Sequence, residues 1–109
     1  KVTHAFITNN EGEVLAKTAK CSVTAQDINS ILFSLFSSYR GMVKITVFSD
    51  VYTCFKHDEH SLVGRASTDI FVARRGQQSI VVGFCDALTP GSCVKEVQEI
   101  SELLNKRGL

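Results

Sequence analysis

Residues 79–94 read SIVVGFCDALTPGSCV, and this stretch decides the fold because it joins a buried strand to the start of a helix. Residues 80–82 are consecutively apolar, as is typical of a strand covered on both faces in the middle of a sheet. Thr89 then predicts an N-cap, and Pro90 suits the first helical position, where its missing N–H is not needed. The stretch therefore predicts a helix that follows a central strand.

Apolar residues at helical spacing predict two helices. The C-terminal helix ends near Gly108, and its apolar stripe consists of Val94, Val97, Ile100 and Leu104. An earlier helix begins with Thr24 as N-cap and Asp27 in the capping-box position, and Gly41 is predicted to end it. Its stripe consists of Ile28, Ile31, Leu32, Leu35, Phe36 and Tyr39.

Runs of alternating or apolar residues between turn signals predict the strands of an antiparallel sheet. These runs cover residues 3–8, 13–17, 42–48, 51–56, 62–65, 70–73 and 79–85. Turns are expected at Ser49-Asp50 and at Arg75-Gly76. Strands that pair in hairpins, together with two helices, indicate an α+β domain in which the helices cover the sheet.

Size and composition indicate one folded domain over residues 1–109. Hydrophobic residues make up 44% of the chain and charged residues 21%, which is typical of a globular protein with a packed core. The formal net charge of +1 argues against nucleic acid as a partner. No apolar stretch is long enough to span a membrane, so a cytoplasmic location is expected.

The four cysteines are predicted to be reduced and buried. Cys54 and Cys85 lie in apolar or strand-like runs, where a free cysteine behaves as a small hydrophobic residue. A chain with an adequate core does not need disulfides, so we favour free thiols at Cys21 and Cys93 as well.

No pattern in the sequence predicts catalysis. Residues 57–60, His-Asp-Glu-His, have metal-ligand types, but they straddle a strand end and a turn, so their side chains should diverge. Cys93 lies in the first turn of a helix but has no base, and the Gly64 segment lacks the glycine spacing and lysine of a phosphate loop. We therefore expect no enzyme activity, no metal and no cofactor.

Basic residues form the remaining candidate site. Arg74 and Arg75 end one strand, Lys95 lies on the last helix, and Lys56 and Arg65 are expected across the sheet from them. An acidic protein surface or an anionic lipid headgroup would complement such a patch.

Several segments together resemble the profilin family. The residues 88–94, Leu-Thr-Pro-Gly-Ser-Cys-Val, followed by a helix that ends near Gly108 and Leu109, are similar to the profilin C-terminus. The Arg-Arg turn in residues 72–76 before the apolar strand at 80–83 resembles the profilin pattern of a strand, a basic turn and an apolar strand. The N-terminal hairpin, residues 5–16, is also similar.

The resemblance implies a profilin-like central antiparallel sheet with helices on both faces, and a cytoplasmic, cytoskeletal protein. It also implies that the chain binds the actin monomer and regulates actin filament assembly, and that Arg74 and Arg75 could bind phosphoinositides. The actin-binding residues carried over from the family are Lys56, Arg74, Arg75, Val94, Lys95 and Glu99. Charges of this kind set orientation and association rate.

The aromatic platform that profilins use for proline-rich peptides is degenerate in this sequence. Its positions correspond to Leu15, Leu103 and Leu109, and the chain has no tryptophan. The family's N-terminal helix is also absent from the sequence, which should leave apolar sheet surface uncovered beside the last helix. Weak or absent binding of proline-rich proteins is therefore expected. The alternative to a profilin is a roadblock-like or longin-like scaffold or trafficking module that binds protein partners without actin.

Overall fold

The computed structural model describes residues 2–109, which form one seven-stranded antiparallel sheet and two helices. The strand order across the sheet is β2-β1-β7-β6-β5-β4-β3, and every neighbouring pair is antiparallel. The elements are β1 (Val2–Thr8), β2 (Val14–Lys17), α1 (Ala25–Phe36), β3 (Val43–Val47), β4 (Asp50–His57), β5 (Ser61–Arg65), β6 (Asp69–Arg75), β7 (Ile80–Asp86) and α2 (Pro90–Lys106). The α+β prediction is confirmed.

The strand β7 lies inside the sheet and is covered on both faces, as the apolar run predicted. It pairs with β1 on one side and β6 on the other, and its residues from Ile80 to Cys85 are all buried. Side chains alternate between the two faces of a strand, so β7 contributes to a core on each side of the sheet. Ile80, Val82 and Phe84 belong to one core, and Val81 and Cys85 to the other.

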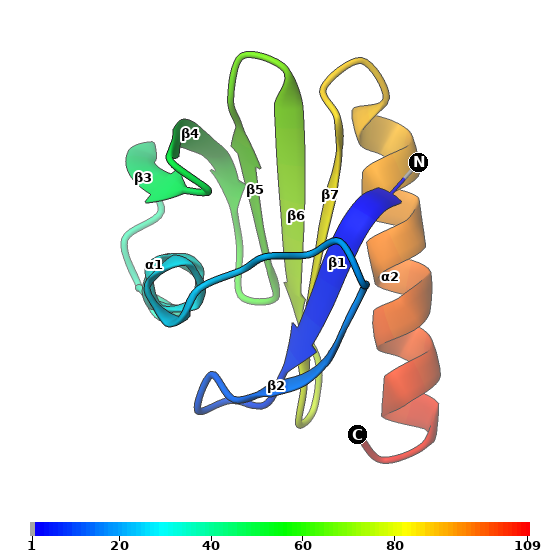
Figure 1. The fold of residues 1–109 in the computed structure, drawn as a ribbon. Coiled ribbons are helices and arrows are strands. Elements are labelled where there is room, and N and C mark those ends of the chain that lie inside the picture. The colour runs from blue at the N-terminus through cyan, green and yellow to red at the C-terminus, as the bar shows by residue number, and fades with distance from the viewer. Residues whose placement is uncertain (1) are drawn as a thin grey trace.

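The two helices lie on opposite faces of the sheet, which gives three layers (Figure 1). The larger core, under α1, contains Ile31, Leu35, Tyr52, Phe71 and other buried residues. The smaller core, under α2, includes Cys93 and Val97 together with strand residues of β5, β6 and β7. No helix within residues 2–109 has the length and apolar character that crossing a membrane requires.

Helix α1 begins where the sequence predicted but ends earlier. Thr24 and Asp27 form a complete capping box. The helix stops at Phe36, Tyr39 is 61% exposed, and Gly41 does not cap it, so this part of the prediction is wrong. The physical reason is a contact from β4, because the His57 ring nitrogens lie 3.0 Å from the carbonyl oxygens of Leu35 and Tyr39.

Helix α2 follows the prediction at both ends. Pro90 is its first residue, and Gly108 lies beyond its last turn with a φ of 75°, which only glycine adopts readily. The N–H groups of Leu109 and Gly108 donate to the carbonyls of Leu104 and Asn105, as in a Schellman cap. The cap brings the C-terminal leucine back toward the sheet.

All four cysteines are buried and free, as predicted. Burial raises the pKa of the Cys54 thiol to about 11, and burial with a contact from Cys85 raises the pKa of Cys93 well above its usual range. Thiols that stay protonated are poor nucleophiles. The position of Cys93 at the start of a helix therefore serves packing against β7.

Candidate protein-binding face

One part of the α2 side of the sheet carries no helix. Helix α2 contacts β1, β6 and β7, while α1 contacts β3 and β5 from the opposite face, so the α2 side of β3, β4 and β5 is uncovered within residues 2–109. We call this surface the open sheet face. Its outward-pointing side chains are Lys44, Val51, Phe55, Lys56, Arg65 and Arg74.

Strand register places Lys56 and Arg74 on this same face. Lys56 pairs with Val63 of β5, which pairs with Val72 of β6, and both valines belong to the core under α2. Arg74 lies two residues beyond Val72, so it points to the same side. These two predicted site residues are therefore brought together.

An irregularity in β4 adds an aromatic residue that sequence reasoning missed. The register between β4 and β5 shifts between Cys54 and Lys56, so Phe55 is an extra residue in a β-bulge. Cys54 faces the core under α1, and the next side chain therefore points to the α2 side, where Phe55 is 51% exposed. No local sequence signal marks this bulge, because it depends on the pairing with β5.

The charge on the open sheet face is positive and unpaired. Among the described residues, none of its lysines and arginines forms an ion pair, and the one carboxylate in β3, β4 and β5, that of Asp50, points to the α1 side of the sheet, as Tyr52 does. Val51 on the same face is 58% exposed. The surface thus combines exposed apolar side chains with positive charge, a composition suited to a protein partner with acidic residues.

Arg75 does not share this face, contrary to the grouping predicted from sequence. It pairs with Ile80 of the core under α1, and its guanidinium carbon lies 4.6 Å from the centre of the Phe36 ring. This cation–π contact holds Arg75 against the C-terminal end of α1. The two consecutive arginines therefore serve opposite layers of the molecule.

The predicted residues of α2 differ in how close they lie to the open sheet face. Val94 packs partly against the core, whereas Lys95 and Glu99 are exposed on the outer surface of the helix. The side of α2 that faces β6 is marked by Asn105, which accepts a bond from the Gln77 N–H in the β6–β7 turn. Gln98, one turn beyond Val94, lies on this side and was not predicted.

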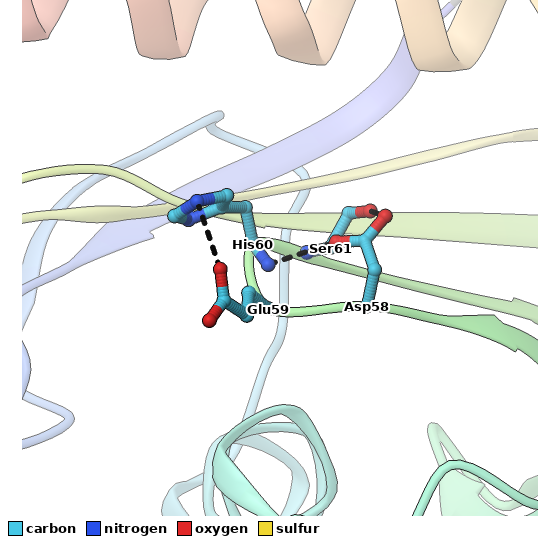
Figure 2. Close-up of polar contacts among 4 residues, drawn as sticks. All are labelled: Asp58, Glu59, His60 and Ser61. Carbon is cyan, nitrogen blue, oxygen red and sulfur yellow. Dashed lines mark hydrogen bonds and ion pairs between the residues drawn. The ribbon is translucent and has the colours of Figure 1, made fainter.

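The turn between β4 and β5 is organised by Asp58 and does not gather ligands for a metal. The Asp58 carboxylate accepts bonds from the N–H groups of His60 and Ser61 and from the Ser61 hydroxyl (Figure 2). Partial burial works to raise the pKa of Asp58, but these bonds and the Lys56 charge outweigh it, and the pKa is lowered. His60 instead approaches Glu59, 3.9 Å away. No group of three ligand side chains converges in the described part of the chain.

Comparison with known proteins identifies the family. A model of the profilin family matches residues 1–109. The chain belongs to the profilin family. Membership of the profilin family favours the interpretation of this chain as a profilin-type protein over the roadblock-like or longin-like alternative. No curated protein has a matching sequence.

Solved profilin structures share the fold at low sequence identity. Schizosaccharomyces pombe profilin is 20% identical, with a TM-score of 0.86 over 100% of this chain and 89% of that one. Acanthamoeba castellanii profilin IB is 19% identical, with a TM-score of 0.87 over 99% and 88%. LokiProfilin1, solved in complex with rabbit actin, is 14% identical, with a TM-score of 0.79 over 96% and 84%.

The positions expected to form the profilin peptide platform are only partly assembled. Leu15 and Leu109 line a pocket of about 300 Å³ with Leu104, whereas Leu103 is 53% exposed and does not line it. The Ser79 hydroxyl, also in this lining, is buried without a hydrogen-bond partner among the described residues. None of the described residues that line this pocket is aromatic.

A second groove in this profilin lies on the α2 side of the sheet. It has a volume of about 230 Å³ and lies between the β1–β2 hairpin and α2, with Ile7, Ala16, Val81 and Ile100 among its lining residues.

Proposed function

We propose that this profilin binds the actin monomer through the open sheet face and the adjoining side of α2, and thereby regulates filament assembly in the cytoplasm. The observation that carries the proposal is an uncovered, positively charged sheet surface beside the C-terminal helix in a chain of the profilin family. The profilin solved with rabbit actin has the same fold, which supports actin as the partner. The proposed function is binding, without a chemical reaction.

The open sheet face supplies two kinds of contact. Phe55 and Val51 offer apolar surface that a partner would bury, and aromatic residues often contribute most to such interfaces. Lys56 and Arg74 supply charge that steers an acidic partner and fixes its orientation. Val94 borders this surface from α2, and Lys95 and Glu99 would contact only a partner that extends over the outer surface of the helix.

Two further properties of the profilin family, binding of phosphoinositides and of proline-rich peptides, are also proposed for this chain. Lys56, Arg65 and Arg74, which form no ion pair within residues 2–109, would suit a phosphoinositide headgroup, which would then compete with actin for the same face. Binding of proline-rich peptides should be weak, because the Leu15–Leu109 pocket lacks the aromatic rings on which a polyproline II helix packs.

Neighbouring arginines give a sharp test of the actin face. In a pyrene-actin polymerisation assay, the unmodified protein should slow spontaneous nucleation, and Arg74→Glu should relieve this inhibition. Arg75→Glu is the matched control, because it makes the same charge change one residue away on the opposite layer. Arg75→Glu loses the cation–π contact with Phe36, which should lower the free energy of unfolding by about 0.5–1 kcal/mol. Circular dichroism therefore checks that this variant is folded.

Comparison of the two variants separates an effect on the open sheet face from a general effect on folding. Loss of one partner of a charge pair buried in an interface typically costs about tenfold or more in affinity, so Arg74→Glu, which also reverses the charge, should weaken actin binding by at least that factor. Equal effects of the two substitutions, or no effect of the unmodified protein at concentrations well above actin, would contradict the proposal. Lys95→Glu then tests the outer surface of α2, and relief by this substitution alone would move the site from the sheet to the helix.

A further inference from the structure

A small pocket at one end of the α1 side of the sheet has no role in the proposed actin face. It is lined by His4, Lys20, Ser22, Phe48, Asp50, Tyr52 and Asp69 and has a volume of about 260 Å³. Asp69 lies two residues before Phe71 on β6, in the core under α1, so the pocket opens on the face opposite to Arg74. It is separated from the proposed actin contacts by the full thickness of the sheet.

Two carboxylates and an unpartnered hydroxyl meet in this pocket. Tyr52 is 1% exposed and lines the pocket, and no hydrogen bond joins its hydroxyl to another described residue. Burial, and then the negative charges of Asp69 and Asp50, raise the pKa of Tyr52 to about 12. Both carboxylates therefore lie near a phenol that keeps its proton, and neither carboxylate forms an ion pair within residues 2–109.

The other lining groups favour a planar organic cation. His4 and Phe48 contribute rings whose centroids are 5.3 Å apart, and Tyr52 adds a third. Burial lowers the pKa of His4, although the Asp69 charge works to raise it, so a positive charge on the imidazole is disfavoured. Guanidinium groups stack on aromatic rings and donate paired N–H bonds to carboxylates, whereas the ammonium group is more strongly hydrated.

We propose that this pocket binds the guanidinium group of an arginine side chain on a partner protein, held by Asp50, Asp69 and the Tyr52 hydroxyl. The volume lies below the range of about 300–1,000 Å³ that is typical for whole small-molecule ligands, which favours a single side chain as the occupant. Lys20, which also lines the pocket, is exposed and forms no ion pair with either carboxylate among the described residues, so the carboxylates stay available. The occupant reaches a face that stays free when actin is bound as proposed.

The test is a nuclear magnetic resonance titration with arginine capped at both ends, N-acetyl-arginine-N-methylamide. We expect saturable amide shifts centred on His4, Asp50 and Asp69, and none from the capped citrulline analogue, which has the same shape without the charge. Asp69→Asn should weaken binding about tenfold or more, because a charge-assisted hydrogen bond becomes a neutral one. Tyr52→Phe should weaken it by a smaller factor while keeping the ring packing.

The matched control is Glu59→Gln, which makes the same charge change at the other end of β4 and should leave the arginine affinity unchanged. Should Asp69→Asn fail to fold, Asp50→Asn replaces it. The assignment is overturned if capped arginine gives no saturable shifts, if capped citrulline gives equal shifts, or if the folded carboxylate variant binds with unchanged affinity. It is also overturned if free arginine binds and capped arginine does not. Asp69→Asn should leave actin inhibition intact and Arg74→Glu should leave arginine binding intact, so failure of either proposal is recognised separately.

Discussion

The His4 ring lies flat against Phe84, with centroids 4.7 Å apart and an interplanar angle of 9°. This packing removes water from one face of the imidazole, and burial lowers its pKa from the usual 6.5, although the Asp69 charge works in the opposite direction. Protonation of His4 is thus less favourable in the folded protein than in the unfolded chain. A single residue links folding stability to pH near neutrality.

The sign of this link gives the first prediction. The unfolded chain binds the His4 proton at higher pH than the folded protein does, so the His4 contribution is present above pH 6.5 and is lost as pH falls through the lowered folded pKa. The free energy of unfolding should therefore fall between about pH 7.5 and 5.5. Urea denaturation at several pH values measures it.

His4→Phe is the matched variant for this prediction, because it keeps an aromatic ring against Phe84 and removes the titrating group. Its stability should depend less on pH across the same window. Parallel pH profiles for the two proteins would show that other groups cause the dependence. The Asp58 carboxylate, whose pKa is lowered, would act only at more acidic pH.

Individual side-chain directions are the part of the site that sequence could not give. Lys56 and Arg74 were both predicted, and register shows that they share a face. Arg75 was grouped with them because it is adjacent in sequence, but alternation along β6 sends it to the other layer. Phe55 became visible only when the pairing of β4 with β5 revealed a bulge.

Among the elements, α1 shows how one helix start can hold a distant turn. The Asp27 carboxylate accepts the Thr24 N–H at 3.1 Å through one oxygen and the Phe48 N–H at 3.2 Å through the other. Phe48 and Ser49 occupy the β3–β4 turn with φ values of 53° and 65°, a left-handed conformation that is uncommon for residues other than glycine. The carboxylate therefore joins the helix cap to a strained turn.

Two substitutions separate these roles. Thr24→Ala removes the cap alone and should lower the free energy of unfolding by about 1 kcal/mol. Asp27→Ala also leaves the partly buried Phe48 N–H without its acceptor, and should cost about 2 kcal/mol. Equilibrium urea denaturation measures both, with the exposed Asn29→Ala as the control on the same helix. Equal losses for Thr24→Ala and Asp27→Ala would show that the bond to Phe48 contributes nothing.

Helix starts were easier to predict than the end of α1, because their signals are local. Thr24, Asp27 and Pro90 lie within a few residues of the groups they serve. The end of α1 depends on His57, which is 22 residues from the Leu35 carbonyl that it contacts. Tyr39 continued the helical spacing in sequence, yet its backbone had already left the helix.

At the scale of the whole molecule, the sheet is most protected at its centre and least at one edge. β7 is buried on both faces between β1 and β6, whereas every residue of β2 is exposed and pairs only with β1. Opening β7 requires disruption of both cores, while β2 can open without either.

Hydrogen exchange tests this difference. Amide protons of β7 should exchange by global unfolding, so their exchange free energies should equal the free energy of unfolding from denaturation. Amide protons of β2 should exchange orders of magnitude faster by local opening. Comparable protection of the two strands would contradict a sheet whose stability is concentrated at β7. The measurement is native-state exchange followed by nuclear magnetic resonance at low urea concentrations.

The overall architecture was predictable because its signals agree with one another. The apolar run in β7, the Thr89-Pro90 helix start and the stripe of α2 all indicate a sheet covered by a terminal helix, and the same segments carry the family resemblance. The arginine pocket was not predictable, because its carboxylates lie on β4 and β6 and meet only through the strand order.

The two arginines that end β6 also limit where the chain can change in length. A residue inserted inside β6 with pairing to β5 retained would exchange the layers of every later side chain in that strand, and Arg74 would enter the core under α1. An insertion in the short connection at residues 66–68 leaves the pairing of both strands intact. Insertions and deletions during evolution should therefore accumulate in that connection, while the length of β6 stays fixed.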